Sequence, residues 1–333
     1  MIPTNLKKTT EWRFDDILFC IASDTGSSRV WFGSSDFNVY EFDTSQEKPE
    51  RTAFTGDSHE SYVTGIVRVG NTLISCGYDR RMVWWDIESK HSIRRVDAHD
   101  KWIRAIVASP DRTRVTTVAD DMQCKVWEVA TGNLLASFSD HQSMTPHHFP
   151  SMLYAVAASP DGKWISTGDR VGHVAIWDAM SFAKVGEIET PIMYTWDPRA
   201  RRHSTGGIRS LAFSPDSQFL AVGGVGKIGN IDHLDGPARL EVFRLPGGER
   251  TLELEDNKKK GLIEQIVWSP DGKWILTAGG DNNGFVTVHD ADSGVLAHQD
   301  GQDGHIHAMT HDQEFSNFHA ASHQRITRWS MNS

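Results

Sequence analysis

The chain of 333 residues repeats one short turn four times. Each copy reads Ser-Pro-Asp, and the copies begin at Ser109, Ser159, Ser214 and Ser269. Two copies extend to an identical hexapeptide, at residues 159–164 and 269–274. Proline sets φ for the first central position of such a turn, and apolar, β-branched runs lie on both sides of it. Each copy therefore predicts a strand, a tight turn and a second strand.

A second mark recurs along the chain at a period of about 42 residues, within the range of four-stranded propeller blades. An apolar alternating strand ends in a large side chain that is aromatic in six of seven copies. These positions are Phe42, Trp85, Trp127, Trp177, Phe243, His289 and Trp329. The two repeats together predict an all-β fold, a seven-bladed β-propeller of four-stranded antiparallel blades.

The second and third of these blades carry a further pattern, through which the chain resembles the WD-repeat (WD-40-type) family over essentially its whole length. The resemblance implies that a His, a Ser or Thr, an Asp and a Trp form a buried hydrogen-bonded set in each blade. The positions that match are His59, Ser75, Asp79 and Trp85 in one blade, and His99, Thr117, Asp121 and Trp127 in the next. A buried carboxylate and a buried indole N–H each need such a partner.

The other blades depart from this pattern at the acidic position. Asp36, Asp79 and Asp121 each lie six residues before their aromatic residue. In predicted blades 4 to 7 the same position holds Val171, Pro237, Asn283 and His323. We expect these four blades to rely on packing alone.

The order of the strands predicts how the ring closes. The last repeat supplies three strands and ends near Trp329, whereas a spare strand, roughly Thr9 to Phe14, precedes the first repeat. We expect this N-terminal strand to pair with the C-terminal blade, beyond the strand at 325–331, because the pairing removes an exposed sheet edge. On this interpretation residues 1–333 form a single propeller domain.

Composition limits the functional classes. The formal charge of −10 argues against a general nucleic-acid binder, which normally has a basic footprint. No apolar run reaches the roughly 18 residues that a membrane span needs. Three cysteines, Cys20, Cys76 and Cys124, are far apart, which disfavours a disulfide scaffold or a thiolate zinc site. With no apolar signal core after Met1, we expect a reducing, cytoplasmic location.

Three connections are longer than the repeat requires, at 140–152, 190–207 and 223–238. In a WD-repeat blade such connections lie at one end of the sheets, called here the top face. We expect all three to gather there, over predicted blades 4 and 5. Long loops on a rigid scaffold often bind partners, although these loops would also fill space by packing on each other. The candidate anchors in the second loop are Tyr194, Trp196, Arg199, Arg201 and Arg202.

The central opening offers a second candidate surface. Alignment on the first strand of each blade brings Thr64, Arg104, Tyr154, Arg209, Glu264 and His307 to equivalent positions, with Tyr62 and Trp102 at the rim. The resemblance implies that such positions contact ligands. Trp102 has an alternative role, which is packing against the neighbouring loop.

The chemistry-bearing residues support neither a catalytic nor a metal site. The closest histidines are His147–His148 and His305, His307 and His311, and no third ligand is spaced convincingly. The run from Gly223 to Lys227 lacks the Ser or Thr and the helix of a phosphate-binding loop. No activated nucleophile is evident. The sequence therefore predicts neither enzymatic activity nor a cofactor.

The leading interpretation is a non-catalytic protein-interaction scaffold. Its top face, and especially the loops of blades 4 and 5, would bind another protein or a peptide, with an acidic or phosphorylated segment as one option because of the three arginines. Two alternatives stay open. One is a metal-dependent propeller hydrolase or lactonase, and the other is a recruitment subunit of an RNA-processing or chromatin complex.

Overall fold

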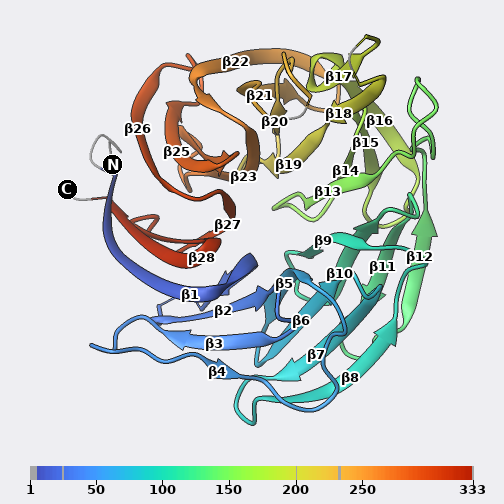
Figure 1. Ribbon diagram of the computed structural model, residues 1–333. Coiled ribbons are helices and arrows are strands. Elements are labelled where there is room, and N and C mark those ends of the chain that lie inside the picture. Colours follow the sequence, from blue (N-terminus) through green and yellow to red (C-terminus); the bar gives the residue numbers. More distant parts are fainter. Residues whose placement is uncertain (1–5, 25, 200, 232–233, 332–333) are drawn as a thin grey trace.

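The structure is a computed structural model that describes residues 6–24, 26–199, 201–231 and 234–331. Antiparallel sheets are arranged in a ring around a common centre, as Figure 1 shows. Three four-stranded sheets follow one another in the first half of the ring. Their strands are β5 (Val63–Val69), β6 (Thr72–Gly77), β7 (Arg81–Asp86) and β8 (His91–Asp97); β9 (Ile103–Ala108), β10 (Arg114–Ala119), β11 (Cys124–Glu128) and β12 (Leu134–Phe138); and β13 (Leu153–Ala158), β14 (Trp164–Asp169), β15 (His173–Asp178) and β16 (Lys184–Glu189).

Two further four-stranded sheets complete the second half, after a small insertion. The insertion is a 3₁₀ turn and a hairpin: η1 (Pro191–Met193), β17 (Tyr194–Asp197) and β18 (His203–Gly206). The sheets are formed by β19 (Ile208–Phe213), β20 (Phe219–Val225), β21 (Pro237–Arg244) and β22 (Glu249–Lys260), and by β23 (Leu262–Trp268), β24 (Trp274–Gly280), β25 (Asn283–Asp290) and β26 (Leu296–Asp303).

The remaining sheet joins the two ends of the described chain and has six strands. Their order is β27 (Ile306–His311), β28 (Asn317–Met331), β1 (Leu6–Ser23), β2 (Arg29–Ser34), β3 (Val39–Asp43) and β4 (Thr52–Ala53). The first part of β1 pairs antiparallel with β28, from Leu6 opposite Met331 to Arg13 opposite Arg325. The N-terminal strand therefore covers the edge of 325–331, at the expected place.

The number of blades differs from the prediction. Counted as continuous hydrogen-bonded sheets, the described strands form six blades, so the prediction of a seven-bladed ring of four-stranded blades is wrong. The reason is the length of β1, which pairs with β28 through its first half and with β2 from Leu18 to Ser23. Two of the seven repeated strand-end residues, Phe42 and Trp329, therefore lie in one sheet, and counting such residues overcounts the blades.

The repeated turn has the geometry that its sequence predicts. At 159–164, the Ser159 hydroxyl donates to Asp161 Oδ1 over 2.7 Å and accepts the N–H of Trp164 over 2.8 Å. The residue after each Asp has a positive φ, at Arg112, Gly162, Ser217 and Gly272. Only two of these are glycine, so the hydrogen-bonded Ser–Asp pair tolerates the left-handed conformation in the other two.

The core consists of layers between neighbouring sheets rather than one centre. Trp127, for example, packs with Ile74 and Trp84 of the preceding sheet, and Trp329 packs with Leu276 and Val288. The three cysteines are buried and unpaired. No helix in the described ranges is long and apolar enough to cross a membrane.

Candidate functional site

The buried polar set in the β5–β8 sheet is complete. His59 Nδ1 lies 2.9 Å from Asp79 Oδ2, its Nε2 lies 2.7 Å from Ser75 Oγ, and Ser75 accepts the indole N–H of Trp85 over 2.8 Å. Burial alone would raise the pKa of Asp79, but the hydrogen bond and charge of His59 and two backbone N–H groups outweigh it and lower that pKa. The set ties the loop before β5 to two strands.

The β9–β12 sheet repeats the same arrangement. His99 joins Asp121 at 3.0 Å and Thr117 at 2.8 Å, and Thr117 accepts the indole N–H of Trp127 over 2.9 Å. Burial lowers the pKa of His99, and the hydrogen bond from His99 overcomes burial to lower the pKa of Asp121. These two sets are structural, because their members are turned inward between strands.

A third complete set lies in the β13–β16 sheet, so the expectation that this blade relies on packing alone is wrong. His141 Nδ1 is 3.0 Å from Asp169 Oδ2, His141 Nε2 is 2.8 Å from Thr167, and Thr167 accepts the indole N–H of Trp177 over 3.0 Å. Asp169 lies eight residues before Trp177 instead of six, and it also accepts the backbone N–H of Val171. A search at fixed spacing misses it.

The remaining sheets also contain buried polar networks, contrary to the expectation. In β21 the guanidinium of Arg239, only 2% exposed, pairs with Glu241 at 2.7 Å and with Glu253. In β28, Thr327 accepts the indole N–H of Trp329 and donates to Gln302 over 2.7 Å. These sheets satisfy their own buried polar groups with other residue types at other positions.

The three enlarged connections pack on one another. The ring of His147 stacks on Trp196 with centroids 4.2 Å apart, and its Nδ1 lies 2.9 Å from the Tyr194 hydroxyl. Thr195 of the second loop accepts the backbone N–H of Ile228 of the third over 3.0 Å. His141 of the first loop belongs to the buried set above. His233, which the sequence places in the third loop, lies outside the described residues.

The loop arginines differ from the loop aromatics in exposure. Tyr194 and Trp196 are half-buried, whereas Arg199, Arg201 and Arg202 are exposed. The hairpin β17–β18 positions them, because Asp197 accepts the backbone N–H groups of Arg199 and Arg201 at its end. The loops therefore present cationic groups on a packed aromatic base.

The equivalent inner-strand positions lie next to one another around the opening. Arg104 forms a double hydrogen bond with Asp120 at 2.7 Å, and its guanidinium lies 5.3 Å from the centre of the Tyr154 ring. Arg209 covers the same ring from 3.6 Å. Nη1 of Arg209 is buried and has no hydrogen-bond partner among the described residues.

The series continues through histidines on the other side of the opening. Glu264 lies 3.2 Å from Nε2 of His305, and the rings of His305 and His307 are 4.5 Å apart. Burial, with the nearby His305, lowers the pKa of His307 to about 3. Thr64 instead donates to the carbonyl of Ile103 in the next sheet, so it has a structural contact.

An arc of aromatic rings connects these positions along the rim. Trp102, 49% exposed, stacks on Tyr78 with centroids 4.5 Å apart and planes at 9°. Tyr78 contacts Tyr62, which is 40% exposed, and Tyr62 stacks on Phe19. Phe19 then contacts His307 at 5.1 Å. The packing alternative for Trp102 thus covers one face of its ring and leaves half of the side chain in solvent.

Sequence reasoning missed Tyr78 and Phe19 in this arc. Tyr78 directly precedes Asp79 of the buried set, in the turn between the second and third strands, so its place at the top face could have been read from the repeat. Phe19 lies in β1, whose second half was not expected to line the opening. In the sequence Phe19 stands within the unbroken apolar run of residues 17–22, so only the structure shows that it is less buried than its neighbours Leu18 and Cys20.

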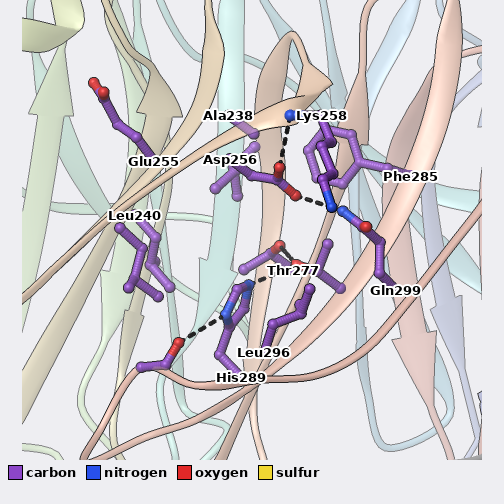
Figure 2. A pocket seen from close by; sticks show the side chains of 14 residues that line it. Ala238, Leu240, Glu255, Asp256, Lys258, Thr277, Phe285, His289, Leu296 and Gln299 are labelled. Atoms are coloured by element: carbon purple, nitrogen blue, oxygen red, sulfur yellow. Dashed lines mark hydrogen bonds between the residues drawn. The ribbon is translucent and has the colours of Figure 1, made fainter.

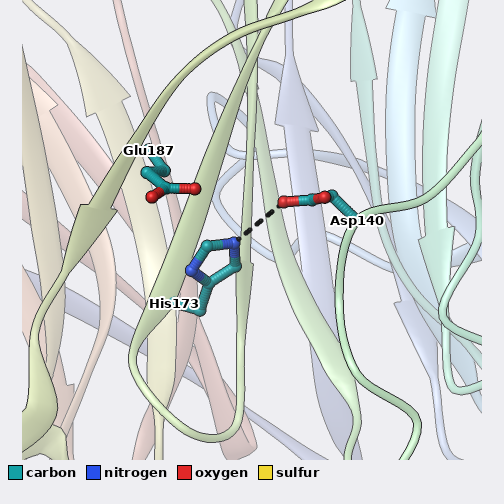
Figure 3. Close-up of side chains that lie close together, drawn as sticks. All are labelled: Asp140, His173 and Glu187. Atoms are coloured by element: carbon teal, nitrogen blue, oxygen red, sulfur yellow. Dashed lines mark hydrogen bonds and ion pairs between the residues drawn. The ribbon is translucent and has the colours of Figure 1, made fainter.

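One cluster outside these surfaces has the composition of a metal site. Figure 3 shows Asp140, His173 and Glu187, and His173 Nε2 lies 3.4 Å from Asp140 Oδ2. The ammonium of Lys184 pairs with Asp140 and, at 2.5 Å, with Glu187. The cluster is therefore a surface ion-pair network in which Lys184 already offsets part of the negative charge.

Comparison with known proteins adds family matches to this geometry. The family model "WD domain, G-beta repeat" matches residues 90–128, 132–178 and 197–228, and the model "Anaphase-promoting complex subunit 4 WD40 domain" matches residues 234–314. The chain belongs to the WD-repeat family. Three complete His–Ser/Thr–Asp–Trp sets agree with that membership. Members of this family generally act as protein-interaction scaffolds and generally not as enzymes.

Individual WD-repeat relatives are distant. Nuclear distribution protein PAC1 of Arthroderma otae is 24% identical over 212 residues, which cover 56% of this chain and 42% of that protein. Eukaryotic translation initiation factor 3 subunit I of Candida albicans is 24% identical over 205 residues, 60% of this chain and 51% of its own. Meiotic recombination protein rec14 of Schizosaccharomyces pombe is 25% identical over 204 residues, which cover 52% of this chain and 66% of that protein. The chain thus spans about half or less of the length of the first relatives it matches.

Proposed function

We propose that this WD-repeat protein is a non-catalytic scaffold that binds a protein or peptide partner on its top face. The observation that carries the proposal is the aromatic arc at the rim, in which Tyr62 stacks on Phe19 and Trp102 stacks on Tyr78, yet the two residues remain 40% and 49% exposed. Exposed, rigid aromatic rings lose little entropy on binding and often dominate interfaces.

Charged groups beside the arc suggest the chemistry of the partner. Arg104 is already neutralised by Asp120, but Nη1 of Arg209 lacks a partner among the described residues. Arg199, Arg201 and Arg202 add exposed cations on the neighbouring loops. An acidic or phosphorylated segment fits this combination, because guanidinium groups bind carboxylates and phosphates in two-pronged geometry. Tyr154 and His307 would line the path between the arc and these arginines.

The test compares affinity capture by matched variants. Tyr62→Ala with Trp102→Ala should weaken capture of the partner by roughly 30-fold or more, the effect of losing an interface hot spot. Arg199→Ala with Arg201→Ala and Arg202→Ala should weaken it less and reduce its dependence on salt. The control is Met180→Ala, which is 70% exposed in the β15–β16 turn at the opposite end of the strands.

The outcomes separate the proposal from its rivals. Full retention of the same partner by the Tyr62–Trp102 variant, with an unchanged melting temperature, would reject the rim as the binding surface. Capture of an oligonucleotide instead of a protein, with a steep loss between low and high salt, would favour a recruitment subunit that contacts nucleic acid.

A further inference from the structure

One of the seven closing positions in the ring lacks a large aromatic side chain. Register places the closing tryptophans of three sheets opposite an apolar residue near the start of the second strand: Trp85 opposite Leu73, Trp127 opposite Val115 and Trp177 opposite Ile165. His289 lies opposite Ile275 in the same register. It is therefore the structural equivalent of these tryptophans, although its ring is smaller than an indole.

A pocket of about 360 Å³ opens at this place, between the β19–β22 and β23–β26 sheets (Figure 2). Its walls are apolar and include Leu240, Leu254, Ile263 and Phe285. Leu296, 45% exposed, belongs to the lining, so the pocket opens to solvent beside β26. The tryptophans pack into the preceding sheet in the same way, as Trp177 does against Val126 and Phe138. The pocket thus occupies the space that an indole fills elsewhere in this chain.

The polar groups at the floor form an ordered chain of hydrogen bonds. His289 Nδ1 lies 3.3 Å from the carbonyl oxygen of Gly294, which can only accept, so Nδ1 carries the proton. Burial lowers the pKa of His289, so the ring is neutral and Nε2 accepts from Thr287 at 3.1 Å. The Thr287 hydroxyl is then the acceptor for the Thr277 hydroxyl at 2.6 Å.

This order leaves one acceptor free in the pocket. Thr277 donates its single proton to Thr287, and its oxygen keeps lone-pair capacity. The equivalent oxygens of Thr117 and Thr167 each accept a tryptophan indole N–H, at 2.9 and 3.0 Å. Thr277 is therefore an indole acceptor whose donor is missing.

The acidic groups at the mouth of the pocket do not favour a cationic ligand. Asp256 accepts from Gln299 and from the backbone N–H of Lys258, and Glu255 pairs with Arg239 at 2.7 Å. Both carboxylates thus already have partners within the chain. Cavities of about 150 Å³ lined by Leu, Ile and Phe bind benzene, and this pocket is larger.

We propose that the pocket between these two sheets binds a small, neutral aromatic molecule of the indole class, whose ring N–H donates to Thr277. The site is separate from the rim and from the loops of the proposed partner surface. Its ligand replaces the side chain that the other sheets supply themselves.

The experiment uses indole and benzofuran, which have nearly the same shape but differ in the N–H, in ligand-detected NMR titrations with the full chain. Wild type should bind indole saturably and more tightly than benzofuran. His289→Trp should fill the pocket, abolish binding of both probes and raise the melting temperature. Thr277→Val should weaken indole about two- to tenfold, the worth of one hydrogen bond, and leave benzofuran within twofold.

Each other result overturns the proposal. Absence of saturable indole binding to wild type would show that the space is not a site. Retention of indole binding by folded His289→Trp would place the site elsewhere. If His289→Trp does not fold, the Thr277→Val variant supplies the test. Equal weakening of indole and benzofuran binding by Thr277→Val would show that the indole N–H does not donate to Thr277.

Discussion

At the scale of single residues, the sheets of this ring satisfy their buried polar groups with different sets of side chains. The indole N–H of a buried closing tryptophan needs an acceptor, and three sheets provide it with a Ser or Thr hydroxyl that is held by a His and an Asp. The carboxylate position tolerates variation, because Asp169, at the end of β14, reaches His141 from a position two residues earlier relative to the tryptophan than Asp79, which reaches His59 from the turn. What matters is where the oxygen atoms lie, not the number of residues before the tryptophan.

Substitution of Asp169 tests how much its carboxylate contributes to stability. Asp169→Ala should lower the free energy of unfolding by about 1–3 kcal/mol, because His141 Nδ1 and the backbone N–H of Val171 lose a buried acceptor. Urea denaturation measures the change. Asp121→Ala should cost a similar amount, whereas Glu88→Ala, at an exposed position, should have little effect. A loss for Asp169→Ala no larger than for Glu88→Ala would contradict the role.

At the scale of elements, β1 determines how the ring is closed. It is the longest strand at 18 residues, and it belongs at once to the outer edge beside β28 and to the inner layer beside β2. Its first half contributes the fully buried Leu6 to the core layer that contains Trp329. Packing as well as hydrogen bonding therefore holds the two ends together.

Closure through β1 predicts a large effect from a single truncation. Leu6→Ala should lower the free energy of unfolding by about 2–5 kcal/mol, the usual cost of a cavity at a buried leucine. Lys7→Ala, on the exposed neighbour, is the matched control. Deletion of residues 1–14 should lower the melting temperature further and expose the β28 edge to aggregation. An unchanged melting temperature after the deletion would show that the ring does not depend on this strand.

At the scale of the whole molecule, buried histidines couple stability to pH. Burial, helped by the charge of Arg328, lowers the pKa of His319 to about 4, and burial also lowers the pKa values of His99, His289 and His307. The folded state therefore binds these protons less readily than the unfolded state. Their stabilising contribution is complete above about pH 6.5 and is lost as the pH falls from there toward each folded pKa.

The free energy of unfolding should consequently fall between pH 7 and pH 4.5. Each histidine should contribute up to about 1 kcal/mol per pH unit while the pH lies between its unfolded and its folded pKa. The lowered pKa values of Asp79 and Asp121 extend the loss to still lower pH. Urea midpoints measured at several pH values check the slope. His319→Phe should flatten it and the exposed His148→Asn should not; equal slopes in all three proteins would contradict the assignment.

Much of this architecture was predictable because it depends on sequence patterns among neighbouring residues. Turn chemistry at Ser159–Trp164 and the alternation that ends in Trp127 depend on a few neighbouring residues, and the same patterns recur. The resemblance to WD-repeat proteins pointed to His59 and His99 as partners of their carboxylates. The number of blades was not predictable in this way, because it depends on whether β1 continues from one sheet into the next.

The candidate sites show the same division. Local sequence indicated the strands, the turns, the family and the inner positions such as Arg104 and Arg209, because short-range backbone preferences and repeat spacing act along the chain. Only packing between distant segments created the arc from Phe19 to Trp102, the stacking of His147 on Trp196, and the pocket beside His289. Those features depend on which side chains meet across neighbouring sheets. The residue types at two distant positions do not by themselves show that the two side chains are in contact.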